Sequence, residues 1–238
     1  MKKTKILSLI LSIILILSFS SCKPQEENPD TSLDNADKTQ ISVATEEVEV
    51  SEIAGYEAQT SENSQIGIIV DSWLKVISIG ERDGALSVLV RNTADFDVQY
   101  AVLSVVCDGK TLKFPMTTLT AGSNAVLTCE TDVKFEKEAQ YYSWEISDKV
   151  IFEEKLSLYP EIFEIEGADG ILSVKNISGK NIDGKIYVYY KTVTDGIYAE
   201  GTTYRICIEG LKKGEKIQIS AEHFKKDTSK VIFVTYVQ

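Results

Sequence analysis

The chain has one histidine, four cysteines and four prolines in 238 residues, and it lacks most of the groups that catalytic motifs require. With His223 as its one histidine it has no Cys/His cluster at metal-ligand spacing. It also has no Gly-x-Ser-x-Gly, His-Glu-x-x-His, phosphate-binding loop or dinucleotide fingerprint. We therefore predict no metal, no cofactor and no catalytic residues, and we interpret His223 as an ordinary surface or turn histidine.

Positive charge is also scarce. The chain has 25 lysines and arginines against 36 acidic residues, a net charge of −11. Because nucleic-acid binding relies on clustered basic residues, we exclude nucleic acid as a partner. The imbalance is local: residues 24–65 contain eleven acidic residues and one lysine, a net charge of −10, whereas residues 66–238 carry only −5.

The N-terminus has the pattern of a signal peptide. Met1 to Lys5 contains three lysines, and Ile6 to Phe19 is an uncharged apolar run, too short for the ~20 residues of a spanning helix. The next residues, in the run Phe19-Ser20-Ser21-Cys22, resemble the lipobox of bacterial lipoproteins. That resemblance implies removal of residues 1–21, lipidation of Cys22, and a lipid-anchored, extracytoplasmic protein at the cell membrane or outer surface of a bacterium.

The segment after Cys22 is acidic and polar. Residues 22–65 contain few large apolar side chains, so they cannot bury enough surface to offset the entropy of ordering, and we expect a disordered tether. An acidic recognition segment for cations or a basic partner is the alternative. Val48 to Ile53 alternates apolar and acidic residues and could pair as an edge strand.

The remaining chain is internally repeated. Ile77 to Asn92 matches Phe163 to Asn176 through shared Asp-Gly, Leu-Ser-Val and basic-Asn steps, and Leu119 to Gly122 matches Leu211 to Gly214 in the same order. The second copy is longer around residues 194–201. We predict two domains, at residues 66–157 and 158–238, with a short semi-rigid junction across residues 155–162.

Each copy is expected to be all-β. The Asp-Gly pairs at residues 83–84 and 169–170 indicate tight hairpins, because such turns need a positive φ. Short alternating strands with frequent turn signals predict a sandwich of two antiparallel sheets. The pattern resembles the small immunoglobulin-like domains of bacterial lipoproteins, FxLYD-type among them, although the FxLYD signature is absent. Asn92 and Asn176 are expected to stabilise turns.

Three cysteines follow Cys22. A disulfide between Cys107 and Cys129 would close a loop of about 22 residues, and an exported location permits it. Strand parity argues against the bond, because alignment with the second copy turns Cys107 outward and Cys129 inward. The pairing stays open at this stage, with Cys207 unpaired in either case.

Two surfaces are candidates for function. The tyrosines of the second copy, Tyr187, Tyr189, Tyr198 and Tyr204, could stack on sugars or anchor a protein, although tyrosine also suits half-buried strands. In the first copy the same parity turns three apolar residues outward, namely Ala101, Leu103 and Val105. Either a partner surface covers them, or a bulge shifts the parity.

These patterns support three hypotheses. The first is a surface or envelope lipoprotein whose two non-catalytic β-sandwich modules bind a protein or a glycan. The second is a structural spacer or envelope-assembly component without its own ligand. The third and weakest is a hydrolase with a carboxylate pair, since acidic residues are plentiful but none is singled out. The oligomeric state is not determined by the sequence.

Overall fold

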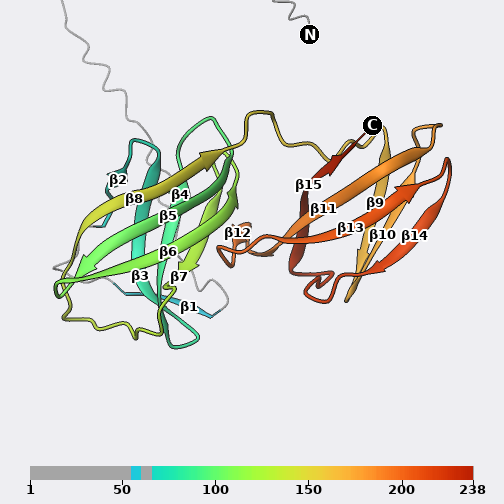
Figure 1. The fold of residues 1–238 in the computed structure, drawn as a ribbon. Coiled ribbons are helices and arrows are strands. Elements are labelled where there is room, and N and C mark those ends of the chain that lie inside the picture. Colours follow the sequence, from blue (N-terminus) through green and yellow to red (C-terminus); the bar gives the residue numbers. More distant parts are fainter. Residues whose placement is uncertain (1–54, 60–65, 238) are drawn as a thin grey trace, which may run out of the picture. The chain divides into compact units, whose positions relative to one another are not determined.

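The computed structural model describes residues 55–59 and 66–237. The signal peptide, Cys22 and the segment Val48 to Ile53 lie outside these residues. The described chain belongs to one compact unit and contains fifteen β-strands and no helix (Figure 1), which confirms the all-β prediction. None of the described residues forms a helix long and apolar enough to cross a membrane.

The first eight strands enclose one hydrophobic core. β3, β4 and β7 form one layer, in which β1 and β2 both pair with β3, and β6, β5 and β8 form the opposite layer. The two layers are called the first sheet pair. Their strands are β1 (Tyr56–Gln59), β2 (Ile69–Val70), β3 (Leu74–Arg82), β4 (Ala85–Asn92), β5 (Val98–Cys107), β6 (Lys110–Leu119), β7 (Asn124–Thr128) and β8 (Tyr141–Ile151).

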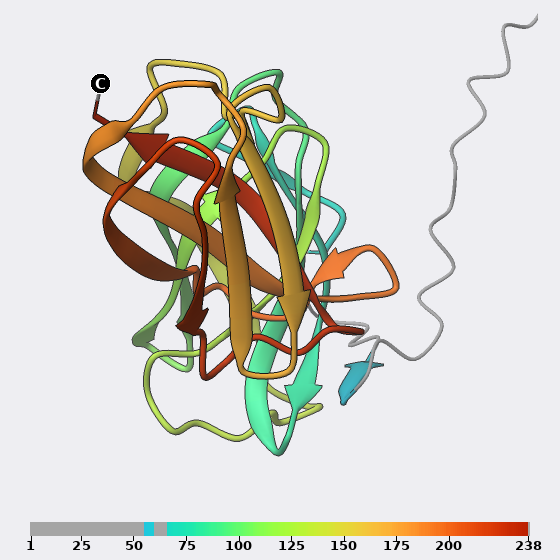
Figure 2. The same ribbon diagram turned by 90° about the vertical axis from the view of Figure 1, so that its right-hand side faces the viewer.

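Six of the last seven strands, all except β12, enclose a second core. β9, β10 and β14 form one layer, and β13, β11 and β15 form the other, so that in Figure 2 the gold β9–β10 hairpin and the dark red β15 lie in different layers. These layers are the second sheet pair. The strands are β9 (Phe163–Ala168), β10 (Ile171–Asn176), β11 (Ile182–Thr194), β12 (Ile197–Tyr198), β13 (Tyr204–Leu211), β14 (Lys216–Ser220) and β15 (Ser229–Tyr236).

Strand pairing follows the same order in both sheet pairs. The sequential strands β3 to β8 pair as β3–β4–β7 and β6–β5–β8, and their counterparts pair as β9–β10–β14 and β13–β11–β15. Both Asp-Gly hairpins are present, with φ of +79° at Gly84 and +72° at Gly170, which glycine adopts without strain. The one strand without a counterpart among β9–β15 is β12. It pairs with β11 and forms a parallel bridge from Tyr198 to Ala125 of β7.

The two asparagines of the repeat hold equivalent turns. Asn92 and Asn176 are fully buried, and each side-chain amide donates to two main-chain carbonyls while its oxygen accepts a main-chain N–H. One of those carbonyls is distant in sequence, that of Leu119 for Asn92 and that of Leu211 for Asn176. The asparagines therefore tie a turn to the end of a neighbouring strand as well as stabilising the turn itself.

The prediction that Ala101, Leu103 and Val105 point outward is wrong. All three are fully buried in the first core, as is Val98 at the start of β5. The register between β5 and β8 shifts between Val98 and Tyr100. An extra residue at this bulge reverses the parity of the rest of the strand, so the bulge alternative is the correct one.

The same shift corrects the argument about the cysteines. Cys107 shares the inward parity of Val105 and packs against the first core, in which Cys129 is buried. Cys107, Cys129 and Cys207 are nevertheless all free thiols in this structure. The bond is absent, but opposite strand faces are not the reason.

Residues 56–59 do not belong to a disordered tether. They form β1, which pairs antiparallel with β3. In this pairing Gln59 lies opposite Ile79, and Tyr56 lies opposite Arg82. The Tyr56 side chain is 2% exposed, its hydroxyl lies 2.8 Å from Ser78 Oγ, and it packs with Leu89, Val126 and Ile197. Tyr56 and Ile197 thus cover the outer side of β4 and β7.

Candidate functional site

Tyr187 and Tyr189 lie next to each other on the outer face of β11. The alternate residues Ile186, Val188 and Tyr190 enter the second core, so two of the four candidate tyrosines lie on the outer face. The two rings have centroids 6.4 Å apart, and both side chains are partly exposed. Two aromatic rings on a sheet surface can contact a planar sugar face or a partner side chain.

Neighbouring strands fix both rings. The guanidinium of Arg205, in β13, lies 5.2 Å from the centre of the Tyr187 ring. The Tyr189 ring stacks on Phe233 of β15 at 4.1 Å with an interplanar angle of 7°. Phe233 in turn meets Phe152 edge-on at 5.2 Å. The tyrosine pair is therefore preorganised, and a partner would not need to order it.

Tyr198 and Tyr204 do not belong to this surface. Tyr198 is 7% exposed and belongs to the first core, with its hydroxyl 2.9 Å from Thr120 Oγ1. Tyr204 packs against the second core, stacks on Tyr190 and on His223, and donates its hydroxyl hydrogen to Glu200 at 3.0 Å. Burial, followed by the Glu200 carboxylate, raises the pKa of Tyr204 to about 12. The four tyrosines thus divide into one surface pair and two internal residues.

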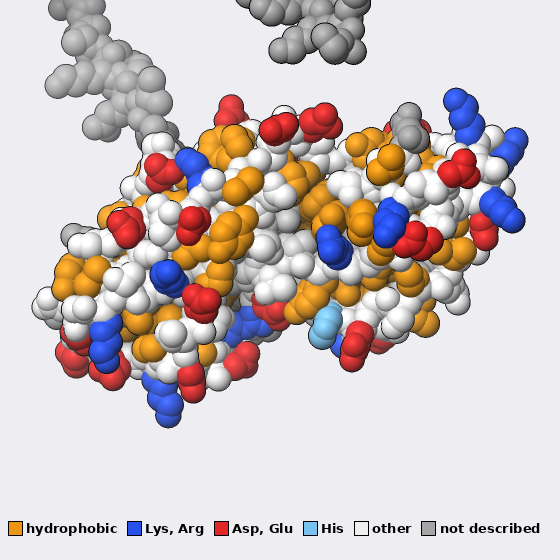
Figure 3. Space-filling view, viewed as in Figure 1, with side chains coloured by type: hydrophobic (Ala, Val, Ile, Leu, Met, Phe, Trp, Pro, Cys, Tyr) orange, Lys and Arg blue, Asp and Glu red, His pale blue; other side chains and the backbone are white. Residues whose placement is uncertain are grey.

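A second apolar surface lies on the first sheet pair. Hydrophobic side chains gather over β5 and β8 on the face drawn in Figure 3. Tyr100 and Val150, which are direct partners across the two strands, are 38% and 49% exposed, and Tyr142 is 40% exposed. The sequence did not single out Tyr100, because the parity that exposes it depends on the bulge in β5.

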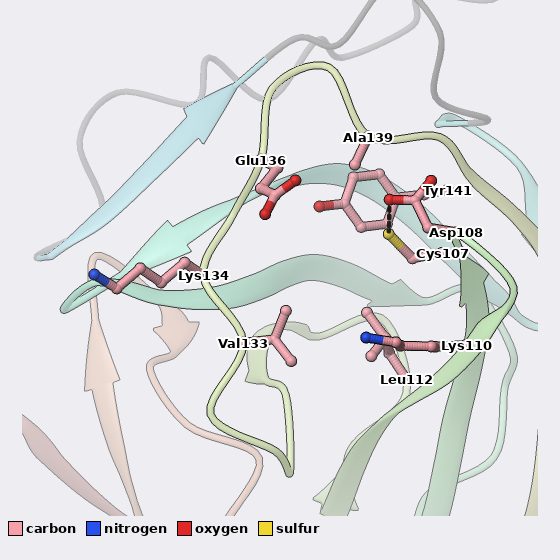
Figure 4. A pocket seen from close by; sticks show the side chains of 9 residues that line it. All are labelled: Cys107, Asp108, Lys110, Leu112, Val133, Lys134, Glu136, Ala139 and Tyr141. Atoms are coloured by element: carbon pink, nitrogen blue, oxygen red, sulfur yellow. Dashed lines mark hydrogen bonds between the residues drawn. The ribbon is translucent and has the colours of Figure 1, made fainter.

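A small pocket next to Cys107 has the chemistry of a protected thiol. Figure 4 shows the Cys107 thiol beside Asp108 and the Tyr141 hydroxyl pointing toward Glu136, and all four residues line a cavity of about 130 Å³. Burial, then the carboxylates of Asp108 and Glu136, raise the pKa of the Cys107 thiol. A nucleophilic cysteine needs a lowered pKa, and ligand pockets usually measure about 300–1,000 Å³. The burial and the two carboxylates therefore keep the Cys107 thiol protonated, and the cavity is smaller than a typical ligand site.

The most unusual group in the described chain is Lys191 of β11. Its side chain is 1% exposed, although it has the same parity along β11 as Tyr187 and Tyr189 on the outer face. Its ammonium donates to the carbonyl oxygens of Thr117 at 2.7 Å and Gly201 at 3.1 Å, and to Thr203 Oγ1 at 3.3 Å. Burial lowers the pKa of Lys191 to about 7, and the Glu200 carboxylate offsets this only in part.

Lys191 is buried because the longer stretch of the second copy contacts the first sheet pair. Thr117 of β6 donates its N–H to the carbonyl of Gly201 at 2.7 Å. A Cβ at position 201 would lie 2.4 Å from the carbonyl oxygen of Pro115, so glycine is required for this approach. Tyr159, in the predicted junction, does not make these contacts: it packs on Tyr236 within the second sheet pair, as does Phe163 at the start of β9.

The described residues hold no group of three or more His, Cys, Asp or Glu side chains placed to bind a metal ion. Comparison with family models, with curated proteins and with solved structures finds no match to this chain.

Proposed function

We propose that this chain is a lipid-anchored extracytoplasmic protein of a bacterial envelope or surface, and that its β-sandwich modules bind a partner protein or a glycan without catalysis. In this proposal Cys22 carries the lipid and the acidic segment after it acts as the tether. The modules are tandem immunoglobulin-like domains at residues 66–157 and 158–238, and β1 (Tyr56–Gln59) adds a strand to the first of them. The repeated order of strand pairing in the two sheet pairs supports this division.

One observation supports the binding surface more than any other. Tyr187 and Tyr189 are partly exposed on one sheet face, and Arg205 and Phe233 hold their rings in place. Fixed aromatic side chains provide contact area at little entropic cost, which is why they are frequent at binding hot spots.

The test compares the full chain with a Tyr187→Ser/Tyr189→Ser variant in pull-downs from envelope fractions, scored both for proteins and for glycans. Ile171→Ser, at an exposed apolar position of β10 in the other layer of the second sheet pair, is the matched control. We expect the double variant to lose at least tenfold of the captured partner and the control to lose none. Equal capture by the parent and the double variant would refute the surface.

The anchor is tested separately by Cys22→Ala, which should abolish incorporation of a labelled lipid. If labelling persists in this variant, the localisation proposed above fails, whatever the result for the tyrosines.

The alternative is a structural spacer, and the burial of Lys191 favours it. Hydrogen bonds from Thr117 and Lys191 to Gly201, together with the Tyr198–Ala125 bridge, link the two sheet pairs. A spacer predicts that the Tyr187→Ser/Tyr189→Ser variant rescues a deletion strain fully, whereas a chain with a shortened tether does not.

A further inference from the structure

The two asparagine turns allow a residue-by-residue comparison of the ends of the two sheet pairs. In the first turn the N–H of Thr93 donates to the carbonyl of Trp73 at 2.7 Å, and in the second the N–H of Ile177 donates to the carbonyl of Ile162 at 2.8 Å. Trp73 and Ile162 therefore occupy equivalent positions.

A second pair of positions follows from the asparagine side chains. Asn92 Nδ2 donates to the carbonyl of Phe96 at 2.9 Å, and Asn176 Nδ2 donates to the carbonyl of Lys180 at 2.6 Å. Phe96 and Lys180 are therefore equivalent too. At both positions the first turn has an aromatic residue and the second turn does not.

The two ends consequently differ in how they are filled. Trp73 is 2% exposed, and its ring packs 6.1 Å from that of Phe96, so two aromatic side chains occupy the end of the first sheet pair. At the corresponding end of the second sheet pair there is a cavity of about 320 Å³, bordered by Ile162 and Lys180. This volume is at the lower limit of the usual range for ligand pockets.

The cavity has an apolar side and a charged rim. Ile162, Ile182 and the ring of Tyr236 form the apolar side, and the rim carries Lys180 and Asp183. Both charged side chains are exposed, and within residues 55–59 and 66–237 neither forms a hydrogen bond or an ion pair. One cation and one anion are thus available beside an apolar space.

Two other polar side chains at the rim are already in use. Asn181 Oδ1 accepts the N–H of Lys213 at 3.0 Å, and the Ser178 hydroxyl donates to Asn176 Oδ1 at 2.7 Å. They shape the turn, whereas Lys180 and Asp183 are left to contact a ligand.

We propose that this cavity binds a small aromatic amino acid, with the aromatic ring in the space that Phe96 and Trp73 fill at the other end. The carboxylate of the ligand meets the Lys180 ammonium, and its amino group meets the Asp183 carboxylate. The site shares no residue with the surface of Tyr187 and Tyr189, so the two proposals can fail independently.

The energetics divide unequally between ring and charges. Burial of apolar surface supplies most of the affinity, whereas each exposed ion pair contributes little. Removal of the ring should therefore abolish binding, and removal of one charged group should weaken it only about two- to fivefold.

Isothermal titration of the full chain with four probes tests the proposal. The four probes are phenylalanine, alanine, 3-phenylpropionate and phenethylamine. A fifth compound, the tripeptide Gly-Gly-Phe, distinguishes a free amino acid from a peptide terminus as the ligand. We expect phenylalanine to bind best, the two single-charge analogues to bind about two- to fivefold more weakly, and alanine not to bind. Equal heats for phenylalanine and alanine, or no binding of any aromatic probe, would overturn the proposal. Tighter binding of Gly-Gly-Phe than of phenylalanine would overturn the free amino acid as ligand.

Two variants place an aromatic residue of the first turn at the equivalent position of the second turn. Lys180→Phe and Ile162→Trp each fill the cavity and should weaken phenylalanine binding at least tenfold, while Lys226→Phe, at an exposed position outside the cavity, should not. Thermal unfolding checks that both variants fold, and if one does not, the other and the probe series on the parent chain decide. Unchanged binding in a folded filled variant would also overturn the proposal.

Discussion

The ammonium of Lys191, in β11, donates a hydrogen bond of 2.7 Å to the main-chain carbonyl oxygen of Thr117, in β6. The two residues belong to different sheet pairs, so this bond crosses from one to the other. No carboxylate in the described residues accepts a hydrogen bond from Lys191, and the lysine is nevertheless buried. A buried ammonium that no carboxylate hydrogen-bonds makes the stability of the protein depend on pH in a specific direction.

The first prediction concerns Lys191→Met. Thr117 O keeps a bond from Thr203 Oγ1, and Gly201 O keeps the Thr117 N–H, so methionine leaves neither carbonyl unpaired. Replacing a buried charge with an apolar side chain of similar size is often neutral or stabilising. We expect Lys191→Met to be as stable as the parent at pH 7, or more stable by about 1–3 kcal/mol. Urea unfolding of both proteins measures the difference.

The pH dependence of that difference has a defined sign. The folded-state pKa of Lys191 is about 7 and its ordinary value is 10.5, so the unfolded chain binds more protons between these values. Parent stability therefore rises with pH above about 7, at up to ~1.4 kcal/mol per pH unit from this group. The difference in the free energy of unfolding between Lys191→Met and the parent should therefore narrow from pH 7 to pH 9. A widening gap would contradict the prediction, and Lys230→Met, exposed on β15, is the control.

The second prediction concerns Gly201→Ala. The added Cβ would lie 2.4 Å from Pro115 O, a main-chain atom that cannot move aside alone, so the contact with β6 must open. We expect a loss of about 1–3 kcal/mol and faster amide hydrogen exchange at Thr117, whose N–H bonds to Gly201. Thr202→Ala, at the exposed neighbouring position, should change neither quantity. Slow exchange at Thr117 in Gly201→Ala would show that the contact tolerates a side chain.

The third prediction concerns Gly80→Ala. A Cβ here would lie 2.0 Å from Glu57 O, so alanine displaces β1 from β3. Exposure of Tyr56 should then allow proteolysis between residues 55 and 60, while the first core remains folded. Gly84→Ala serves as the control, because it strains a positive φ of +79° without approaching β1. Cleavage in Gly84→Ala but not in Gly80→Ala would contradict the role of Gly80.

The fourth prediction concerns the two buried asparagines. Asn92→Ala and Asn176→Ala each remove three hydrogen bonds to main-chain groups and leave two carbonyls and one N–H without these partners. Asn176→Ala also removes the hydrogen bond from the Ser178 hydroxyl. Unsatisfied buried groups cost about 1–3 kcal/mol each. We expect losses of at least about 2 kcal/mol for both variants in urea unfolding, because the two turns are equivalent. A large loss at one site and none at the other would refute the equivalence.

Several features of this protein follow from the sequence because they are local. The Asp-Gly pairs at residues 83–84 and 169–170 need a positive φ, and alternation along residues 182–190 turns Tyr187 and Tyr189 away from a core. Asn92 and Asn176 were recognisable as turn residues for the same local reason. These properties depend on neighbours a few positions away, so the order of residues is sufficient to predict them.

Other features depend on contacts between distant residues and only the tertiary structure decided them. The bulge near Tyr100 buries Ala101, Leu103 and Val105, and it arises from pairing with β8, which the β5 sequence does not encode alone. Lys191 continues the outward alternation of Tyr189, yet it is buried because residues 197–203 lie against the first sheet pair. A strand pattern specifies which face a side chain takes, whereas burial of that face depends on what the rest of the chain places over it.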